Sequence, residues 1–181
     1  MGKTYSEIDD TVRSFIESQH VFFVASAPLD RNGHVNLSPK GLDSLRILGP
    51  TTVAYVDLHG SGIETIAHAK ENGRITLMFC AFEGPPRILR LYGRSRHIDP
   101  QDGKFQELGS HFPAYESPRA VIVVEVTRIA DSCGFGVPLL HYEGQREQLL
   151  AWAKRRGPEG LRTYRRARNR FSIDGLQGIG E

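Results

Sequence analysis

Short apolar runs rich in β-branched residues recur along this sequence of 181 residues, and few helical patterns separate them. Examples are "HVFFVASA" (20–27), "TTVAYVDL" (51–58) and "RAVIVVEVTRIAD" (119–131), which are typical of strands. A parallel sheet would need a helical crossover between most successive strands. We therefore predict a mainly β protein with peripheral helices, built as an antiparallel barrel of six or seven strands.

Further strands are predicted from the same kind of pattern at 35–38, 44–50, 74–82 and 87–98. Asn32-Gly33 is a strong hairpin signal after the first strand. Helical spacing or composition predicts helices at 6–19, 63–73, 100–112, 145–156 and 158–170. We treat 1–181 as a single split-barrel domain and 142–181 as its helical C-terminal extension.

The composition is that of a soluble globular protein, with 39% hydrophobic and 24% charged residues. A net charge of +2 gives no general attraction to nucleic acid or to a membrane surface. Glu7, Asp9 and Asp10 stand where a signal peptide would be apolar, and no run approaches the ~18 apolar residues of a membrane span. The two cysteines, Cys80 and Cys133, form no disulfide framework. We therefore expect a cytoplasmic protein that contacts no membrane.

Several catalytic and cofactor motifs are missing from the sequence. The seven histidines show no metal-ligand spacing, and without H-x-x-x-H or C-x-x-C we expect no metal site. There is no G-x-S-x-G elbow and no Walker loop, and Gly60-Ser61-Gly62 lacks the third glycine of a dinucleotide-binding fingerprint. The sequence therefore nominates no catalytic residue.

The junction "YVDLHGSGIET" (55–65) joins a predicted strand directly to a predicted helix. Ser61 and Glu64 have the spacing of a capping box, in which each side chain accepts from the other residue's backbone N–H. The glycines on both sides of Ser61 favour a second interpretation, because an anion can approach the free N–H groups of a helix start there. The local sequence leaves both interpretations open, a helix cap and a phosphate cradle.

A second candidate is "VNLSPKG" (35–41), where Pro39 ends a strand because it lacks the N–H that ladder pairing needs. Lys40 is then held at the strand end, where its cation can meet a phosphate. Taken alone, an ordinary exposed lysine in a turn explains the segment better. Hairpin-linked strands can, however, bring Lys40 close to Gly60-Ser61-Gly62.

Two other segments carry weaker signals. The irregular stretch "DSCGFGVPLLHY" (131–142) favours a structural or ligand-lining role for Cys133, Gly134 and Phe135, because no adjacent cation would activate the thiol. Residues 154–170 hold eight basic residues against one acid. A solvated helical face is the expected outcome, and few aromatic residues are interleaved to support RNA binding.

Three blocks stand in register, "FFVASAPLDRNGHVNLSPKG" (22–41), "AYVDLHGSGIETIAHAKENGRITLMF" (54–79) and "RILRLYGRSRHI" (87–98). Together they make residues 6–130 resemble the pyridoxamine 5'-phosphate oxidase-like family, the flavin-binding split barrels. The resemblance implies a six-stranded antiparallel split β-barrel of Greek-key type. It also implies a homodimer with one FMN per subunit at the interface.

The resemblance implies which residues hold the flavin. The strand "NLSPK" runs beside it with Lys40 near the flavin or its phosphate, the turn before the helix contacts the phosphate, and Arg90 matches a family arginine. The predicted cofactor-binding residues are Asn36, Leu37, Ser38, Pro39, Lys40, Asp57, Gly60, Ser61, Gly62, Arg90, Cys133, Gly134 and Phe135.

The sequence departs from pyridoxamine phosphate oxidases at three polar contacts. Val35 stands in place of an arginine, Gly62-Ile63 in place of an Arg-Lys pair, and Ile88 in place of a glutamine. We therefore expect a different substrate, with backbone N–H groups at the turn taking over part of the phosphate contact. The positive charge for the phosphate is expected from Lys40 or Arg90.

These observations predict an FMN-dependent oxidoreductase of unknown substrate, with NAD(P)H as a potential electron donor and the flavin supplying the redox chemistry. The alternative is a non-catalytic split barrel that binds or senses haem or deazaflavin. Nucleic-acid binding through the basic C-terminal helices is the weakest alternative.

Overall fold

Antiparallel pairing joins eight strands in the computed structural model, which describes residues 2–116 and 118–179. They are β1 (Thr4–Tyr5), β2 (Phe22–Ser26), β3 (Asn36–Lys40), β4 (Leu45–Gly49), β5 (Thr52–Asp57), β6 (Arg74–Cys80), β7 (Ile88–Ile98) and β8 (Ala120–Ser132). The main path is β3-β2-β6-β7-β8-β5-β4, and the short β1 adds to β8. The prediction of a mainly β, antiparallel protein is confirmed. The six strands implied by the family resemblance are a miscount, because the hairpin of β4 and β5 brings the main path to seven.

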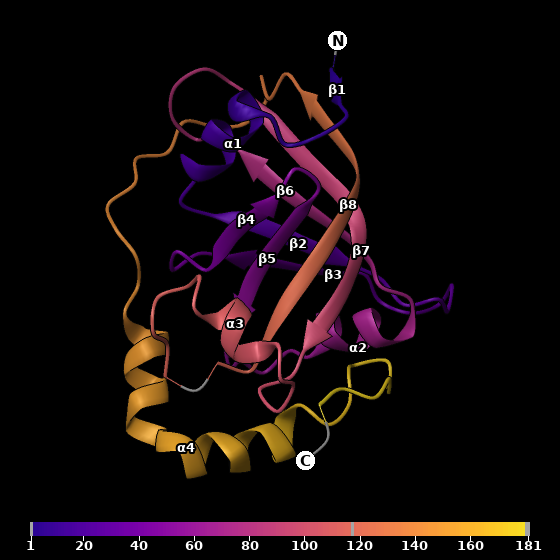
Figure 1. Cartoon of the computed structure of the whole chain (residues 1–181), viewed down its shortest axis with the longest axis vertical. Helices are drawn as coiled ribbons and strands as arrows, with labels where there is room; N and C mark the ends of the chain where they lie inside the picture. Colours follow the sequence, from indigo (N-terminus) through magenta and orange to yellow (C-terminus); the bar gives the residue numbers. More distant parts are fainter. Residues whose placement is uncertain (1, 117, 180–181) are drawn as a thin grey trace.

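The two edge strands, β3 and β4, stand at opposite ends of this path, yet only residues 41–44 join them. In a flat sheet of this size the two edges would lie about 29 Å apart, at ~4.8 Å per strand. The connection spans at most about 18 Å even when it is fully extended. The sheet therefore curls until its edges face each other, and the barrel is split between β3 and β4 (Figure 1).

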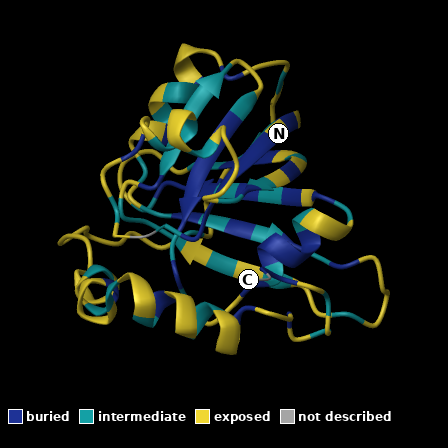
Figure 2. Cartoon of the chain, turned by 60° about the horizontal axis from the view of Figure 1, so that its bottom comes forward, coloured by how far each residue is buried: buried dark blue, intermediate teal, exposed yellow. Residues whose placement is uncertain are grey.

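The hydrophobic core fills the inside of the curled sheet, where the strands are mostly buried (Figure 2). Leu77, Leu89, Leu91 and Ile122 are among its fully buried side chains. The start of β8 is buried on both faces, because a second apolar cluster packs between the outer face of β5 and β8 and helix α3 (Phe105–Gly109). That double burial explains why "AVIVV" in β8 is a continuous apolar run instead of an alternating one.

The helices lie outside the barrel (Figure 1). Helix α1 (Asp10–Glu17) begins at Asp9, whose carboxylate accepts from the Val12 N–H at 2.8 Å. Helix α4 (Gln148–Arg168) is bent where Gly157 takes a φ of 63° just before Pro158. The bend confirms that there are two helical segments here, because the chain leaves helical geometry at Gly157, but they cover 148–156 and 158–168 instead of the predicted 145–156 and 158–170.

The predicted pairing of the first two strands is confirmed, since β2 pairs with β3 in register from Phe22 opposite Lys40 to Ser26 opposite Asn36. Their connection is longer than a two-residue hairpin turn and covers 27–35. The Gly33 N–H donates to the Asp30 carbonyl at 3.0 Å, so Gly33 ends a turn instead of forming its centre.

Two segments lie along the outside of the barrel and reach the split. Residues 133–147, which we call the strap, run down one side of the barrel from the end of β8 to α4 (orange in Figure 1). Residues 169–179, which we call the tail, follow α4 and end with Ile179 buried in the core. In the part of the chain that the structure describes, no helix is long and apolar enough to cross a membrane.

Replacing Gly93 by alanine is expected to destabilise the fold. Gly93 lies where the register of β7 against β8 shifts, and a methyl group there would lie 2.3 Å from the Glu125 carbonyl oxygen. Backbone has to move to relieve that contact, so we expect Gly93→Ala to lower the free energy of unfolding by about 1–3 kcal/mol in urea titrations. Gly103→Ala is the control, because a methyl group at Gly103 would meet nothing within 4 Å. Equal unfolding midpoints for the two variants would contradict this account of the bulge.

Candidate functional site

A cavity of about 620 Å³ opens at the split of the barrel. One wall consists of β3, the connection at 41–44, the end of β5 and the segment 58–65, and the other consists of the strap and the start of α4. This volume falls within the roughly 300–1,000 Å³ of small-molecule sites. The split therefore has room for a small-molecule cofactor.

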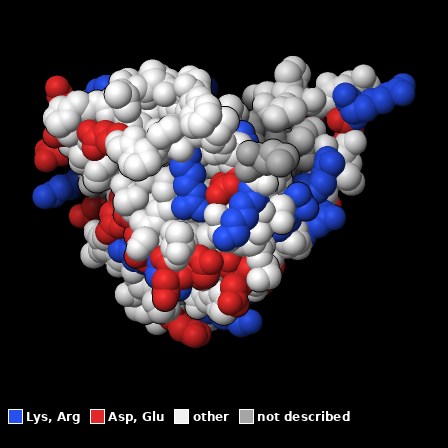
Figure 3. Space-filling view, turned by 90° about the horizontal axis from the view of Figure 1, so that it is seen from above, with Lys and Arg blue, Asp and Glu red and all other residues white. Residues whose placement is uncertain are grey.

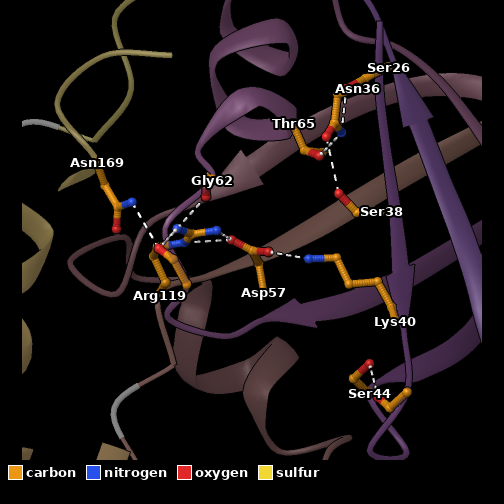
Figure 4. Close-up of polar contacts among 12 residues, drawn as sticks. Ser26, Asn36, Ser38, Lys40, Ser44, Asp57, Gly62, Thr65, Arg119 and Asn169 are labelled. Carbon is orange, nitrogen blue, oxygen red and sulfur yellow. Dashed lines mark hydrogen bonds and ion pairs between the residues drawn. The ribbon is translucent and has the colours of Figure 1, made fainter. Parts of the chain in front are cut away.

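A buried carboxylate lies at the bottom of the cavity, where Asp57 ends β5 with a 1% exposed side chain (Figure 4). Its Oδ1 accepts from Lys40 Nζ at 3.1 Å, and its Oδ2 accepts from Arg119 Nε at 2.7 Å and Nη2 at 2.6 Å. Lys40 belongs to β3, whereas Arg119 immediately precedes β8. Asp57 thus connects one edge of the split to the middle of the sheet.

The cations keep this carboxylate ionised. Burial acts to raise the pKa of Asp57, but Arg119 and Lys40 outweigh it and hold the pKa below its ordinary value. Two cations around one carboxylate leave one positive charge in excess. Arg119 is almost completely buried, while the Lys40 side chain is 24% exposed, so Lys40 is the cation that a ligand can reach.

The backbone of the Gly60-Ser61-Gly62 turn is held by its carbonyl groups. Arg119 Nη1 donates to the Gly62 carbonyl at 2.8 Å and to the Gly60 carbonyl at 3.2 Å. From the tail, Asn169 Nδ2 donates to the Gly60 and Ser61 carbonyls at 3.0 and 3.3 Å. Across the described ranges, the N–H groups of Gly60, Ser61 and Gly62 have no hydrogen-bond partner. The carbonyls are fixed and these N–H groups remain available.

The capping box predicted at Ser61 and Glu64 is wrong. Helix α2 (Glu64–Glu71) has Ile63 at its N-cap, with no side-chain hydrogen bond to the cap. The Glu64 carboxylate instead accepts from the Ile173 N–H of the tail at 3.3 Å. The tail therefore takes the carboxylate that would have closed the box, and the helix start carries no internal cap.

A hydrogen-bonded polar chain runs from the core to the cavity wall (Figure 4). His68 is fully buried, and its Nδ1 lies 2.9 Å from Ser26 Oγ. Asn36 Nδ2 donates to Ser26 Oγ at 3.3 Å and to Thr65 Oγ1 at 3.0 Å, and Ser38 Oγ donates to Asn36 Oδ1 at 3.0 Å. Burial lowers the pKa of His68, so a neutral imidazole anchors the chain. Asn36, Ser38 and Thr65 therefore line the cavity in fixed orientations.

The structure brings most of the predicted cofactor-binding residues to this cavity. Its lining contains Asn36, Ser38, Pro39, Lys40, Asp57, Gly60 and Gly62. Leu37 points from the opposite face of β3 and is 63% exposed. Ser61 is exposed beside the cavity and contributes its carbonyl to the contact with Asn169.

The remaining predicted residues lie elsewhere on this chain. Arg90 on β7 donates to Ser132 Oγ at 3.2 Å and does not line this cavity. Gly134 has a φ of 67° and packs on the backbone of Arg87. Cys133 is exposed, and Phe135 is 80% exposed on the strap. A role for these four residues in binding remains a prediction.

Arg119 is the main residue that the sequence analysis missed. It stands between Pro118 and a long apolar run, and Asp57 pairs with Ala120 in the β5–β8 ladder, so the pairing places Arg119 beside Asp57. A charged residue at the start of the strongest strand was the available signal. Asn169 and the strap residues Tyr142 and Gln145 gave no such signal, because only the long-range fold brings them to the split.

Basic and acidic side chains are mixed on the face near the N-terminus, where both signs lie next to each other (Figure 3). In α4, Arg156 lies 5.1 Å from the ring centroids of both Trp152 and Tyr164, so both rings already contact a cation of the same helix.

The described residues contain no group of three or more His, Cys, Asp or Glu side chains that could hold a metal ion.

Comparison with known proteins identifies the family. The chain belongs to the pyridoxamine 5'-phosphate oxidase family, whose sequence profile matches residues 8–133, so the resemblance found in the sequence is confirmed. The family protein ustO of Aspergillus flavus is 44% identical over 140 residues, which cover 75% of this chain and 56% of that protein. The chain therefore spans little more than half of this relative's length.

Two solved structures share the fold. HupZ of Group A Streptococcus has a TM-score of 0.53 at 23% identity, covering 69% of this chain and 99% of the HupZ chain. A candidate pyridoxamine 5'-phosphate oxidase of Lactobacillus delbrueckii has a TM-score of 0.54 at 16% identity, covering 70% of this chain and 98% of the other. At these low sequence identities, the two comparisons show a shared fold and nothing more.

Replacing Asp57 by asparagine is expected to cost stability in a way that depends on pH. At pH 7 the change leaves Arg119 buried without its charge partner, which should lower the free energy of unfolding by about 3–5 kcal/mol. The pKa of Asp57 is lower in the folded protein, so its contribution is fully present above about pH 4 and is lost as the pH falls through the folded-state pKa. Denaturant titrations from pH 7 to pH 3 should therefore show the gap between wild type and Asp57→Asn narrowing.

Glu7→Gln is the control for this series, because Glu7 is an exposed carboxylate that does not line the cavity. It should follow the wild type within about 0.5 kcal/mol at every pH. A gap between wild type and Asp57→Asn that stays constant down to pH 3 would show that the carboxylate is not held in its charged form by Lys40 and Arg119.

Proposed function

We propose that this chain is a flavoprotein whose cavity at the split binds FMN, with the phosphate at Lys40 and the Gly60-Ser61-Gly62 turn. The observation that carries the proposal is the combination of excess positive charge at Lys40 with unpartnered backbone N–H groups on Gly60 and Gly62, which line the same cavity, considered within the residues described. Membership of the pyridoxamine 5'-phosphate oxidase family, a family of flavin-binding split barrels, supports the same assignment.

The residues present fit a phosphate-bearing group. Both Gly60 and Gly62 line the cavity, and a methyl group added at Gly60 would meet no atom of the described chain within 4 Å. The absence of a side chain there is thus not required by packing, and it leaves the peptide open to a ligand. Backbone N–H groups at the start of α2 favour an anion.

The proposed function assigns binding and orientation to the protein and redox chemistry to the flavin, which supplies hydride or electron transfer when bound. Lys40 and the turn hold the phosphate end. Asn36, Ser38 and Thr65 offer polar groups in fixed positions to the rest of the cofactor. The substrate is expected to differ from pyridoxamine phosphate, because Val35, Gly62-Ile63 and Ile88 replace three of the expected polar contacts.

The proposal includes a homodimer in which a second copy covers the cofactor. Exposed apolar side chains near the split favour such a partner, since Leu37 on the edge strand is 63% exposed and Ile173 on the tail is 69% exposed. In this arrangement Cys133, Gly134, Phe135 and Arg90 would reach a cofactor only across the interface.

The direct test is the absorption spectrum of the purified protein, together with the mass of any copurifying compound. We expect a yellow protein with flavin bands and the mass of FMN, or a colourless protein that acquires those bands when FMN is added. A Soret band would instead show that the bound cofactor is haem. A colourless protein that binds no added FMN in equilibrium dialysis would refute the proposed function.

Replacing Gly60 by alanine should weaken FMN binding without weakening the fold. The added methyl group has open space in the chain itself but stands where the cofactor phosphate approaches the backbone, so we expect a loss of about tenfold in FMN affinity by fluorescence titration. Gly103→Ala, which also adds a methyl group into open space, should bind FMN like the wild type. Unchanged affinity in Gly60→Ala would remove the turn from the phosphate site.

A further inference from the structure

The end of the chain contacts the Gly60-Ser61-Gly62 turn without lining the candidate cofactor cavity. The tail begins at Asn169, a completely buried residue that follows α4. Its Nδ2 donates to the Gly60 carbonyl at 3.0 Å and to the Ser61 carbonyl at 3.3 Å (Figure 4). The family profile ends at residue 133, so this contact comes from a part of the chain that follows the matched core. Asn169 can therefore act on a ligand in the cavity only through the backbone of the turn.

One peptide of the turn depends on Asn169 for its orientation. Each carbonyl shares a planar peptide unit with the N–H of the next residue, and the two groups point in opposite directions. Arg119 Nη1 holds the Gly60 and Gly62 carbonyls. Among the described residues, the Ser61 carbonyl accepts only from Asn169. The Ser61–Gly62 peptide, and with it the direction of the Gly62 N–H, is thus held by Asn169 alone.

This peptide has a second orientation available, because Gly62 carries no side chain. A peptide flip at such a position brings the following residue to positive φ, which glycine adopts without steric cost. After the flip, the Ser61 carbonyl would point where the Gly62 N–H points now, so a partial negative charge would replace a partial positive one. A phosphate favours the N–H orientation. The amide of Asn169 selects that orientation before any ligand arrives.

The remaining contacts of the tail do not involve the carbonyls of the turn. Asp174 accepts from the His34 backbone N–H at 2.8 Å and lies 2.6 Å from His34 Nδ1, in the connection between β2 and β3. The Ile173 N–H donates to Glu64 of α2 at 3.3 Å, and Ile179 is buried in the core. These contacts dock the tail on the barrel beside α2 (Figure 1). Docking of the tail is what supplies the amide at the turn.

We propose that Asn169 is a positioning residue of the phosphate site, and that docking of the tail and occupation of the turn by a phosphate are coupled. The docked amide holds the Gly62 N–H toward the cavity. A phosphate on that N–H in turn favours the peptide orientation in which the Ser61 carbonyl meets the amide. Such coupling is reciprocal, so each event favours the other to the same extent. The inference rests on the proposed function for the phosphate being that of FMN.

The first experiment compares FMN with riboflavin, which has the same ring system and ribityl chain but no phosphate, in the full chain. Asn169→Leu keeps nearly the same side-chain shape and removes the amide donor. We expect this variant to bind FMN about tenfold more weakly in fluorescence titrations and to bind riboflavin like the wild type. Gln177→Leu is the matched control, because it removes an exposed amide from the same segment, and it should bind both flavins like the wild type.

The second experiment measures the reverse direction of the coupling by hydrogen exchange of the tail amides. The Ile173 N–H and the Ile179 N–H, which donates to the Asn169 carbonyl at 2.9 Å, are the reporters. In the wild type, saturating FMN or inorganic phosphate should slow their exchange by about threefold or more, and riboflavin should not. In Asn169→Leu, no ligand should slow it. The wild-type measurement decides on its own should Asn169→Leu fail to fold.

The outcomes separate this inference from the proposed function. Equal loss of FMN and riboflavin affinity in Asn169→Leu, or no loss of either, overturns the positioning role, as does an equal effect of Gln177→Leu. FMN binding that leaves tail exchange as it is with riboflavin overturns the coupling and leaves the flavin function intact. A protein that binds neither flavin, yet whose tail exchange slows in inorganic phosphate, supports the coupling and refutes the flavin function. A tail that responds to neither FMN nor phosphate overturns the inference.

Discussion

The buried carboxylate of Asp57 is the interaction on which the geometry of the split depends. One of its oxygens holds Lys40 on the edge strand β3, and the other holds Arg119, whose remaining N–H groups fix the carbonyls of the Gly60-Ser61-Gly62 turn. Buried ion pairs add little net stability, because the desolvation of the charges offsets their attraction. The value of this one is positional: the same group holds the lysine at the end of the edge strand, holds the arginine that fixes the turn, and leaves one positive charge in excess.

Local patterns were sufficient for the seven strands of the main path, because burial on one or both faces of a strand leaves a periodic signal within a few residues. They missed the short β1, and the helix predicted at 100–112 is only α3 (Phe105–Gly109). The site was predictable only where it follows such local elements, as at Lys40 on the end of β3. Arg119 was missed because its partner is 62 residues away, and only the β5–β8 pairing joins them. The capping box failed for a related reason, since a backbone N–H 109 residues further along takes the Glu64 carboxylate. Arg90 alternates with the buried Leu89 and Leu91, so its side chain leaves the barrel on the outer face.

The two walls of the cavity at the split come from two different regions of the chain. Residues within the family profile provide the polar wall, with its carboxylate, its lysine and its glycine turn. The strap and the first turn of α4, which follow the profile, provide the opposite wall, which includes Tyr142 stacked on His20. The strap contacts the barrel through hydrogen bonds, the His20–Tyr142 ring stack and the close packing of Gly134 on Arg87, and it takes no part in the strand ladders.

The turn at Gly60-Ser61-Gly62 has a consequence for how the protein is made. Its carbonyl groups accept hydrogen bonds from Arg119 and Asn169, which lie 57 and 109 positions later in the chain than the residues they hold. During synthesis the turn leaves the ribosome before either of these side chains does. Until they emerge, the carbonyl groups of the turn are hydrogen-bonded to water. The β2–β3 hairpin and α2 are local elements, whereas the contacts that hold the turn also require the tail to have emerged and docked.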